Sequence, residues 1–172
     1  PRNEESLRNI MYTAQLGLEQ PIAIRYPRGR GTTIDWKTSF QEIQIGKAEK
    51  LIEGDKIAVL VTGSLTETAL QLAEVYPEAV AVYYFGFVKP LDLEALQEVF
   101  STYSTVITLE DGVVSGGFGS AIAEEAIHQN YTGKLELLGI PDRFIEQGTT
   151  EELKASVGLD FESLKVRLSY FM

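Results

Sequence analysis

Three arginines, Arg25, Arg28 and Arg30, lie close together in a chain that is otherwise strongly acidic. Guanidinium groups match phosphate oxygens two at a time, and clustered positive charges are unfavourable unless an anion or acidic side chains compensate them. Gly29 and Gly31 allow backbone atoms to approach a ligand closely. The pattern predicts a phosphate-binding loop. The residues alone leave one alternative open, in which the arginines pair with acidic side chains at a domain boundary.

Glycines are concentrated in a second loop, Gly-Gly-Phe-Gly-Ser at residues 116–120, just before an expected helix. The N-terminus of a helix can bind an anion. The dinucleotide fingerprint, however, needs a glycine where Ile122 stands, and the Lys-Ser or Lys-Thr pair of a P-loop is missing. We therefore predict that Gly116, Gly117 and Gly119 serve close packing, either of the helix on the sheet or of one subunit on another.

Two adjacent carboxylates, Glu110 and Asp111, follow an expected core strand and could bind a hard cation or act as a base. Because successive strand residues point to opposite faces, a turn or capping role is favoured instead. Ser64 and Thr149 each stand three residues before a glutamate and are interpreted as helix N-caps. His128, late on a helix and off its apolar face, is interpreted as a surface residue.

Asp142 and Arg143 follow a proline at the end of the last expected strand, and they are predicted to form either a salt-bridged turn or an interface contact. No set of side chains completes a catalytic constellation. With no cysteine and one histidine, the chain offers no thiolate site and too few soft ligands for zinc or iron. We therefore predict neither a catalytic nor a metal-binding residue in this chain.

The composition indicates a soluble globular protein, with 44% hydrophobic and 23% charged residues in a chain of 172. No apolar run reaches the roughly 20 residues needed to span a bilayer. The 15 basic and 25 acidic residues give a net charge of −10, which opposes binding to nucleic acid or to anionic membranes. The chain opens at Pro1 with no signal peptide, and the expected location is the cytoplasm.

Helical and strand patterns alternate along the chain. A helix capped by Asn3 is expected near the start, followed by a short buried strand at residues 22–24 and a polar linker at residues 32–44. Residues 45–52 then predict an edge strand. Continuous apolar runs predict covered strands at residues 57–61, 80–84, 106–109 and 135–138, with helices between and after them. The pattern predicts an α/β fold with a mostly parallel sheet between helical layers.

Five segments, in this order, resemble the carboxy-terminal third of the 1-deoxy-D-xylulose-5-phosphate synthases, a thiamine-diphosphate-dependent family of the transketolase superfamily. They are Arg-Tyr-Pro-Arg-Gly at 25–29, Ile-Gly-Lys-Ala at 45–48, Phe-Val-Lys-Pro-Leu-Asp at 87–92, Gly-Gly-Phe-Gly-Ser-Ala at 116–121 and Gly-Ile-Pro-Asp-Arg-Phe-Ile-Glu-Gln-Gly at 139–148. The resemblance implies a three-layer transketolase C-terminal domain with a mixed sheet at residues 45–172, a linker at 32–44, and the last helix and strand of a pyrimidine-binding domain at 1–31.

In this family, pyruvate adds to thiamine diphosphate, loses carbon dioxide and is joined to glyceraldehyde 3-phosphate, and the product feeds isoprenoid, thiamine and pyridoxal biosynthesis. The resemblance assigns contact with the substrate phosphate to Arg28, with Arg25 and Arg30 as secondary candidates. It implies a homodimer, and it places thiamine diphosphate and Mg²⁺ in the full-length enzyme, outside this chain. The chain alone is expected to be inactive and to bind neither group.

Two other interpretations are weighed against this one. The β subunit of a 2-oxo-acid dehydrogenase E1 component shares the C-terminal fold and the glycine loop. It is expected to lack the arginine loop and the Pro-Asp-Arg-Phe segment, because its lipoyl acceptor carries no phosphate. The other interpretation is a non-catalytic dimerisation module, which is compatible in part with the first, since the superfamily uses this domain for association more than for chemistry.

Overall fold

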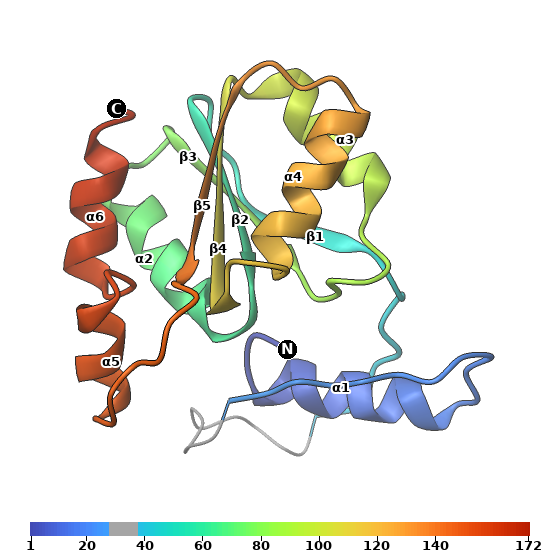
Figure 1. The fold of residues 1–172 in the computed structure, drawn as a ribbon. Helices are drawn as coiled ribbons and strands as arrows, with labels where there is room; N and C mark the ends of the chain where they lie inside the picture. The colour runs from blue at the N-terminus through green and yellow to red at the C-terminus, as the bar shows by residue number, and fades with distance from the viewer. Residues whose placement is uncertain (28–37) are drawn as a thin grey trace.

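The computed structural model describes residues 1–27 and 38–172 of the chain. Its centre is a five-stranded sheet with helices on both faces, and a further helix lies beyond the carboxyl ends of the central strands (Figure 1). The strands are β1 (Ala48–Ile52), β2 (Ile57–Thr62), β3 (Val80–Phe85), β4 (Thr105–Val113) and β5 (Lys134–Ile140). Each of the predicted apolar runs forms one of these strands, because a strand covered on both faces needs apolar residues throughout.

The strand order is β1-β3-β2-β4-β5, with β1 antiparallel to β3 and the other pairs parallel. The predicted mixed, mostly parallel sheet is confirmed, and so is the edge position of β1. After β2 the chain adds β3 on one side of β2, and after β3 it returns to add β4 on the other side of β2. The strand order therefore reverses between β2 and β4, and in open α/β sheets the crevice at such a point is where ligands bind.

Two apolar layers cover the sheet. One face packs against α2 (Thr66–Val75) and α6 (Phe161–Ser169), and the other against α3 (Leu93–Thr102) and α4 (Phe118–His128). The short helix α5 (Thr150–Ser156) leads into α6. Alternate residues of β2 enter the two layers, with Val59 on the first side and Leu60 on the second, and both are at most 1% exposed. None of the described helices is long and apolar enough to cross a lipid bilayer.

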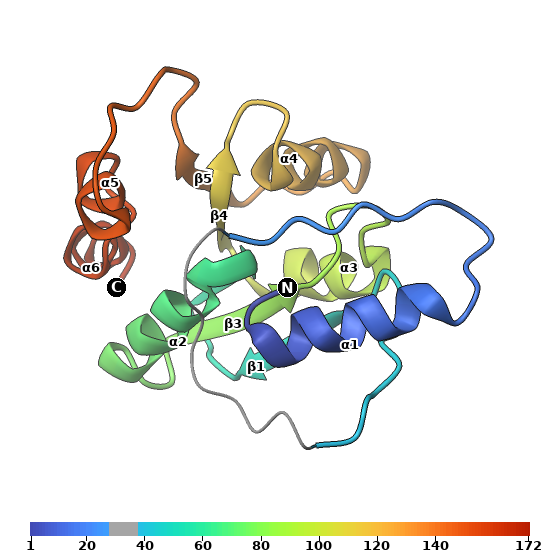
Figure 2. The same ribbon diagram turned by 90° about the horizontal axis from the view of Figure 1, so that it is seen from below.

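Helix α1 (Glu4–Gln15) is capped by Asn3, as predicted, and the Asn3 side chain accepts a hydrogen bond from the Ser6 backbone N–H. The helix lies across the carboxyl ends of the central strands, and the chain that follows it runs back alongside α1 (Figure 2). The buried residues of α1 are Asn9, Ile10 and Thr13, so its buried face is partly polar. Thr13 is buried while Met11 is 49% exposed, because α1 packs against a polar chain segment as well as against apolar residues.

Two sequence predictions need correction. The strand expected at residues 22–24 is irregular chain, because none of the described strands runs beside it to complete a hydrogen-bonded ladder. The capping box expected at Ser64 and Glu67 is also absent. A short 3-10 helix, η1 (Gly63–Leu65), precedes α2, no side-chain cap forms there, and the Ser64 hydroxyl bonds elsewhere. The cap at Thr149 is confirmed, and Asp92 and Asp160 cap α3 and α6.

Candidate functional site

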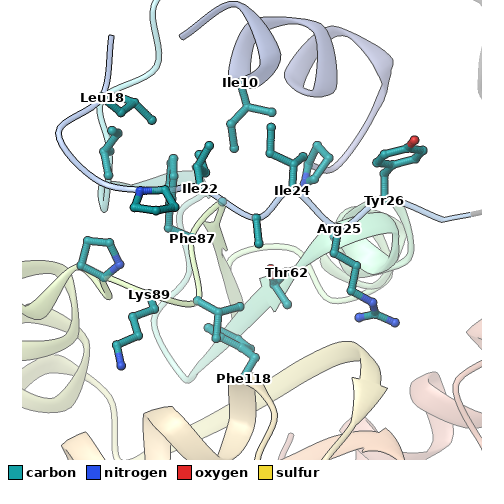
Figure 3. A pocket seen from close by; sticks show the side chains of 18 of the residues that line it. Ile10, Leu18, Ile22, Ile24, Arg25, Tyr26, Thr62, Phe87, Lys89 and Phe118 are labelled. Atoms are coloured by element: carbon teal, nitrogen blue, oxygen red, sulfur yellow. The ribbon is translucent and has the colours of Figure 1, made fainter. Parts of the chain in front are cut away.

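A cavity of about 830 Å³ lies where the strand order reverses, between the segment that follows α1 and the carboxyl ends of β2, β3 and β4. Figure 3 shows its apolar walls, which face one another from the two parts of the chain. The N-terminal wall includes Ile10, Leu18, Ile22 and Ile24, and the opposite wall includes Phe87 and Phe118. A volume of this size is typical of small-molecule sites.

Arg25 is the one member of the predicted arginine loop that the described residues place at this cavity; Arg28 and Arg30 lie outside the described residues. Its exposed side chain reaches toward the end of β4. A Cβ atom built on Gly112 would lie 3.2 Å from Arg25 Nη1 and 3.0 Å from Glu110 Oε2, so the glycine allows both groups to approach the strand. No carboxylate of the described residues forms an ion pair with Arg25.

Glu110 is the anion at the N-terminus of α4. Its carboxylate is only 4% exposed and accepts hydrogen bonds from the backbone N–H groups of Phe118 at 2.9 Å and Gly119 at 2.8 Å. The capping role predicted for Glu110 is therefore confirmed. The protein's own carboxylate therefore occupies the position at this glycine loop where a phosphate could bind.

Two glycines of this loop, Gly117 and Gly119, have no room for a side chain. A Cβ atom on Gly117 would lie 2.3 Å from Glu110 Oε2 and from Val113 O, and one on Gly119 would lie 2.7 Å from Thr108 Oγ1. These distances support the packing role predicted for both residues. Gly116 has open space around it but adopts φ +73°, a left-handed conformation that glycine accepts without strain.

Ser64 and Asp111 join the ends of the two central strands. Ser64 Oγ donates a hydrogen bond to Asp111 Oδ2 at 3.1 Å, and both residues line the cavity. Sequence reasoning missed this pair, because Ser64 fitted a capping pattern. The available signal was topological: both residues follow core strands whose carboxyl ends meet at one edge of a parallel sheet.

Asp92 connects two of the segments that carry the family resemblance, residues 45–48 and residues 87–92. Its buried carboxylate accepts hydrogen bonds from the backbone N–H groups of Ala48 at 2.9 Å and Ala95 at 3.2 Å, and it lies 3.5 Å from Lys47 Nζ. Burial alone would raise the pKa of Asp92, but these two donors and the Lys47 charge hold the pKa below its ordinary value. Gly46 lies against Pro90 in the same junction. These contacts join the two segments, and residues of both, among them Ile45 and Phe87, also line the cavity.

Asp142 and Arg143 are not brought to the cavity. Both are exposed on the loop after β5, and no ion pair joins them. The Arg143 backbone N–H donates to Pro141 O at 2.7 Å. The interface role stays a prediction. His128 is exposed, as predicted, and lies 3.5 Å from Glu125. No group of three or more potential metal ligands gathers anywhere in residues 1–27 and 38–172.

Comparison with known proteins gives a consistent family. Residues 46–164 match the model described as the transketolase C-terminal domain. The 1-deoxy-D-xylulose-5-phosphate synthase of Phocaeicola vulgatus is 44% identical over 175 residues, covering 99% of this chain and 28% of that protein. The synthase of Cytophaga hutchinsonii is 44% identical over 168 residues, covering 95% and 26%. The chain thus spans about a quarter of the length of these relatives.

Solved structures with the same fold include a split gene transketolase described as an inactive β4 tetramer. It is 27% identical, with a TM-score of 0.71 over 83% of this chain and 48% of that chain. The transketolase of Campylobacter jejuni is 21% identical, with a TM-score of 0.51 over 73% of this chain and 18% of that chain, and it shows the fold alone.

Proposed function

This chain belongs to the family of transketolase C-terminal domains, and on that premise we propose that it is the C-terminal part of a 1-deoxy-D-xylulose-5-phosphate synthase. The observation that carries the proposal is the identity of 42–44% to curated synthases over nearly the whole chain. In this function the full-length enzyme condenses pyruvate with glyceraldehyde 3-phosphate and releases carbon dioxide. Its product would supply isoprenoid and thiamine biosynthesis in the cytoplasm.

The described residues do not fit thiamine diphosphate or Mg²⁺. The N-terminus of α4, a position that a diphosphate could use, is filled by the Glu110 carboxylate, and no three carboxylate or histidine ligands converge in the described residues. We propose that both groups bind to parts of the enzyme outside this chain, and that this chain alone is inactive.

The contribution proposed for this chain is electrostatic. Arg28 would hold the phosphate of the aldehyde substrate, as its place in the Arg-Tyr-Pro-Arg-Gly segment of the synthase family implies. Arg25 supports this assignment, because its guanidinium lines the cavity from the same segment and, although the Glu110 carboxylate lies near it, forms no ion pair with a described carboxylate. A charge-assisted contact to phosphate is stronger than a neutral hydrogen bond, and it favours a phosphorylated aldehyde over an unphosphorylated one.

Assembly as a homodimer is part of the same proposal. The split gene transketolase that shares this fold is described as a tetramer of its own chain, which favours self-association. Sedimentation of this chain tests whether the domain itself drives assembly. A dimer would place the main contacts here, and a monomer would place them elsewhere in the enzyme.

The activity is tested with the full-length enzyme. Carbon dioxide release from pyruvate should depend on glyceraldehyde 3-phosphate, and unphosphorylated glyceraldehyde should be a much poorer acceptor. Transfer of the two-carbon unit to a lipoyl domain, without response to glyceraldehyde 3-phosphate, would instead identify a 2-oxo-acid dehydrogenase component and refute the proposal.

A further inference from the structure

Arg2, just before α1, contacts two side chains of the sheet. Arg2 Nη1 lies 3.3 Å from Glu49 Oε2, and Arg2 Nη2 donates to Glu49 Oε1 at 3.5 Å. The guanidinium also lies 5.2 Å from the ring centroid of Tyr84, within the range of a cation–π contact. Glu49 on β1 and Tyr84 on β3 are directly opposite each other, so two neighbouring strands present both groups to one cation. We call Glu49 and Tyr84 the Arg2 socket.

The Arg2 socket is partly open to solvent. Tyr84 is 8% exposed, whereas the side chains of Arg2 and Glu49 are 27% and 58% exposed. The buried ring therefore gives the guanidinium a fixed surface, and the ion pair is formed at the edge of that surface. An ion pair that is open to water contributes little free energy and is screened by salt. The contact is thus weak enough to break and form again in the folded protein.

Helix α1 is bound to the chain that leads into β1. Asn9 Oδ1 accepts a hydrogen bond from Gln41 N at 3.2 Å, and Thr13 Oγ1 accepts one from Ile43 N at 2.8 Å. Asn9 and Thr13 are both buried. Because these bonds hold the backbone itself, the described residues 38–43 belong to the same rigid body as α1.

Residues 44–47 connect this body to β1. They form a turn in which Gly46 adopts φ +73° and Lys47 N donates to Gln44 O at 3.4 Å. The turn precedes β1 directly, and glycine accepts changes of backbone conformation at little cost. Helix α1 is therefore attached to the sheet through a short turn on one side and through the Arg2 socket on the other.

Helix α1 and its ends form one wall of the cavity. Pro1, next to Arg2, and Ile10, on the buried face of α1, both line it. Residues 17–27 continue from α1 along the same wall, and Phe87 lies on the opposite wall (Figure 3). A movement of α1 away from the sheet would therefore separate the two walls.

We propose that the Arg2 socket is a latch that holds α1 over the cavity, and that α1 turns about residues 44–47 when the latch releases. The structure shows the closed state. Release of Arg2 widens the cavity on the side of α1, so the latch controls the access of small molecules. High ionic strength favours release, because it screens the ion pair. The proposal concerns access to the cavity and holds for any molecule that enters it.

Movement of α1 can be measured directly, because the chain has no cysteine to interfere with labelling. Spin labels on Glu5→Cys, in α1, and Glu67→Cys, on α2, report one distance distribution by double electron–electron resonance. Both positions are exposed. Arg2→Glu and Glu49→Arg each place like charges together, and each should broaden the distribution toward longer distances. The double variant restores an ion pair of reversed polarity and should be narrower than either single variant.

Lys165→Met is the matched control for these variants. Lys165 makes the same two kinds of contact, with Glu162 at 3.4 Å and with the ring centroid of Phe161 at 5.8 Å, but it makes them within α6. Its loss should leave the distance distribution unchanged, because neither partner belongs to α1 or to the Arg2 socket. Circular dichroism checks that every variant is folded.

Access to the cavity is measured by thiol labelling. Phe87 is 8% exposed and its neighbour Val88 is 44% exposed, so Phe87→Cys reports opening and Val88→Cys is the exposed reference. Arg2→Met should speed the reaction of a maleimide at position 87 about three- to thirtyfold, the range expected for one exposed ion pair and one cation–π contact. The rate at position 88 should hardly change. Raising the salt to about 1 M should speed the reaction at position 87 in the parent more than in Arg2→Met.

An unchanged distance distribution in folded Arg2→Glu and Glu49→Arg variants would overturn the proposal. Equal labelling rates at position 87 with and without Arg2→Met would do the same, because the latch would then not control access. Neither measurement uses enzyme activity, so a failure of the proposed synthase function leaves both results valid.

Discussion

Glu110 Oε1 accepts a hydrogen bond of 2.8 Å from the backbone N–H of Gly119, so a strand end supplies the capping anion of the helix that follows it. The second carboxylate oxygen binds the N–H of Phe118 at 2.9 Å. These bonds are buried, and their loss leaves two donors without a partner or water. The glycine loop is therefore a structural contact that connects β4 to the N-terminus of α4.

Removing this carboxylate should destabilise the domain. We expect Glu110→Ala to lower the free energy of unfolding by about 2–4 kcal/mol, because two buried N–H groups lose their acceptor. Urea titration followed by circular dichroism measures the change. Glu110→Gln keeps one acceptor oxygen and should lose less. A Glu110→Ala variant as stable as the parent would show that these two hydrogen bonds do not contribute to the stability of the domain.

The close contacts of Gly117 predict a large steric effect. Gly117→Ala should cost at least about 2 kcal/mol, because its Cβ would lie 2.3 Å from a backbone oxygen as well as from Glu110. Gly116→Ala is the matched control. It has no neighbour within 4 Å, and we expect about 1 kcal/mol from its left-handed backbone alone. If thermal unfolding shows the same loss of stability in Gly117→Ala and Gly116→Ala, the packing role of Gly117 is contradicted.

The phosphate role of Arg28 predicts a selective kinetic defect in the full-length enzyme. Arg28→Ala should lower kcat/KM for glyceraldehyde 3-phosphate roughly 10- to 150-fold, the equivalent of about 1.5–3 kcal/mol for one charge-assisted contact. The value for pyruvate should hardly change. Lys56→Ala, an exposed cation just before the amino end of β2, is the control and should leave both values unchanged. Equal losses for both substrates in Arg28→Ala would reject the assignment.

Asp92 predicts a pH dependence of stability. Its pKa is lowered below the ordinary value of 3.8, so the ionised form stabilises the fold above that value. This contribution is lost as the pH falls through the folded-state pKa. Asp92→Asn should therefore be clearly less stable than the parent at pH 7, and the difference should shrink as the pH falls from 3.8 through the lower folded-state pKa of Asp92. Unfolding curves at pH 7 and below pH 3.8 check this. A difference that stays constant with pH would exclude the ionised carboxylate as its cause.

The sheet was predictable from sequence because a strand covered on both faces is apolar at every position. The helix faces were less predictable. Ile127 and Leu93 are apolar residues of α4 and α3, yet they are 76% and 52% exposed, so neither side chain is buried against the sheet. The short-range cap at Thr149 was predictable, since its donor and acceptor lie three residues apart.

The candidate site was predictable only in part. The arginine pattern led to a segment whose Arg25 lies at the cavity, while Arg28 and Arg30 lie outside the described residues. The partner of Ser64 is 47 residues away, and the partners of Asn9 and Thr13 are 32 and 30 residues away. Such pairs depend on how the chain folds back on itself, which local patterns do not encode.

Glu110 and Asp111 are consecutive on β4, yet one binds the start of α4 and the other binds Ser64 beside α2, on the other side of the sheet. If β4 slipped by a single residue against its neighbours, each carboxylate would turn toward the wrong layer and both connections would break together. The two adjacent acidic residues thus stabilise the correct alignment of β4. A misaligned strand would lose the hydrogen bonds of both carboxylates.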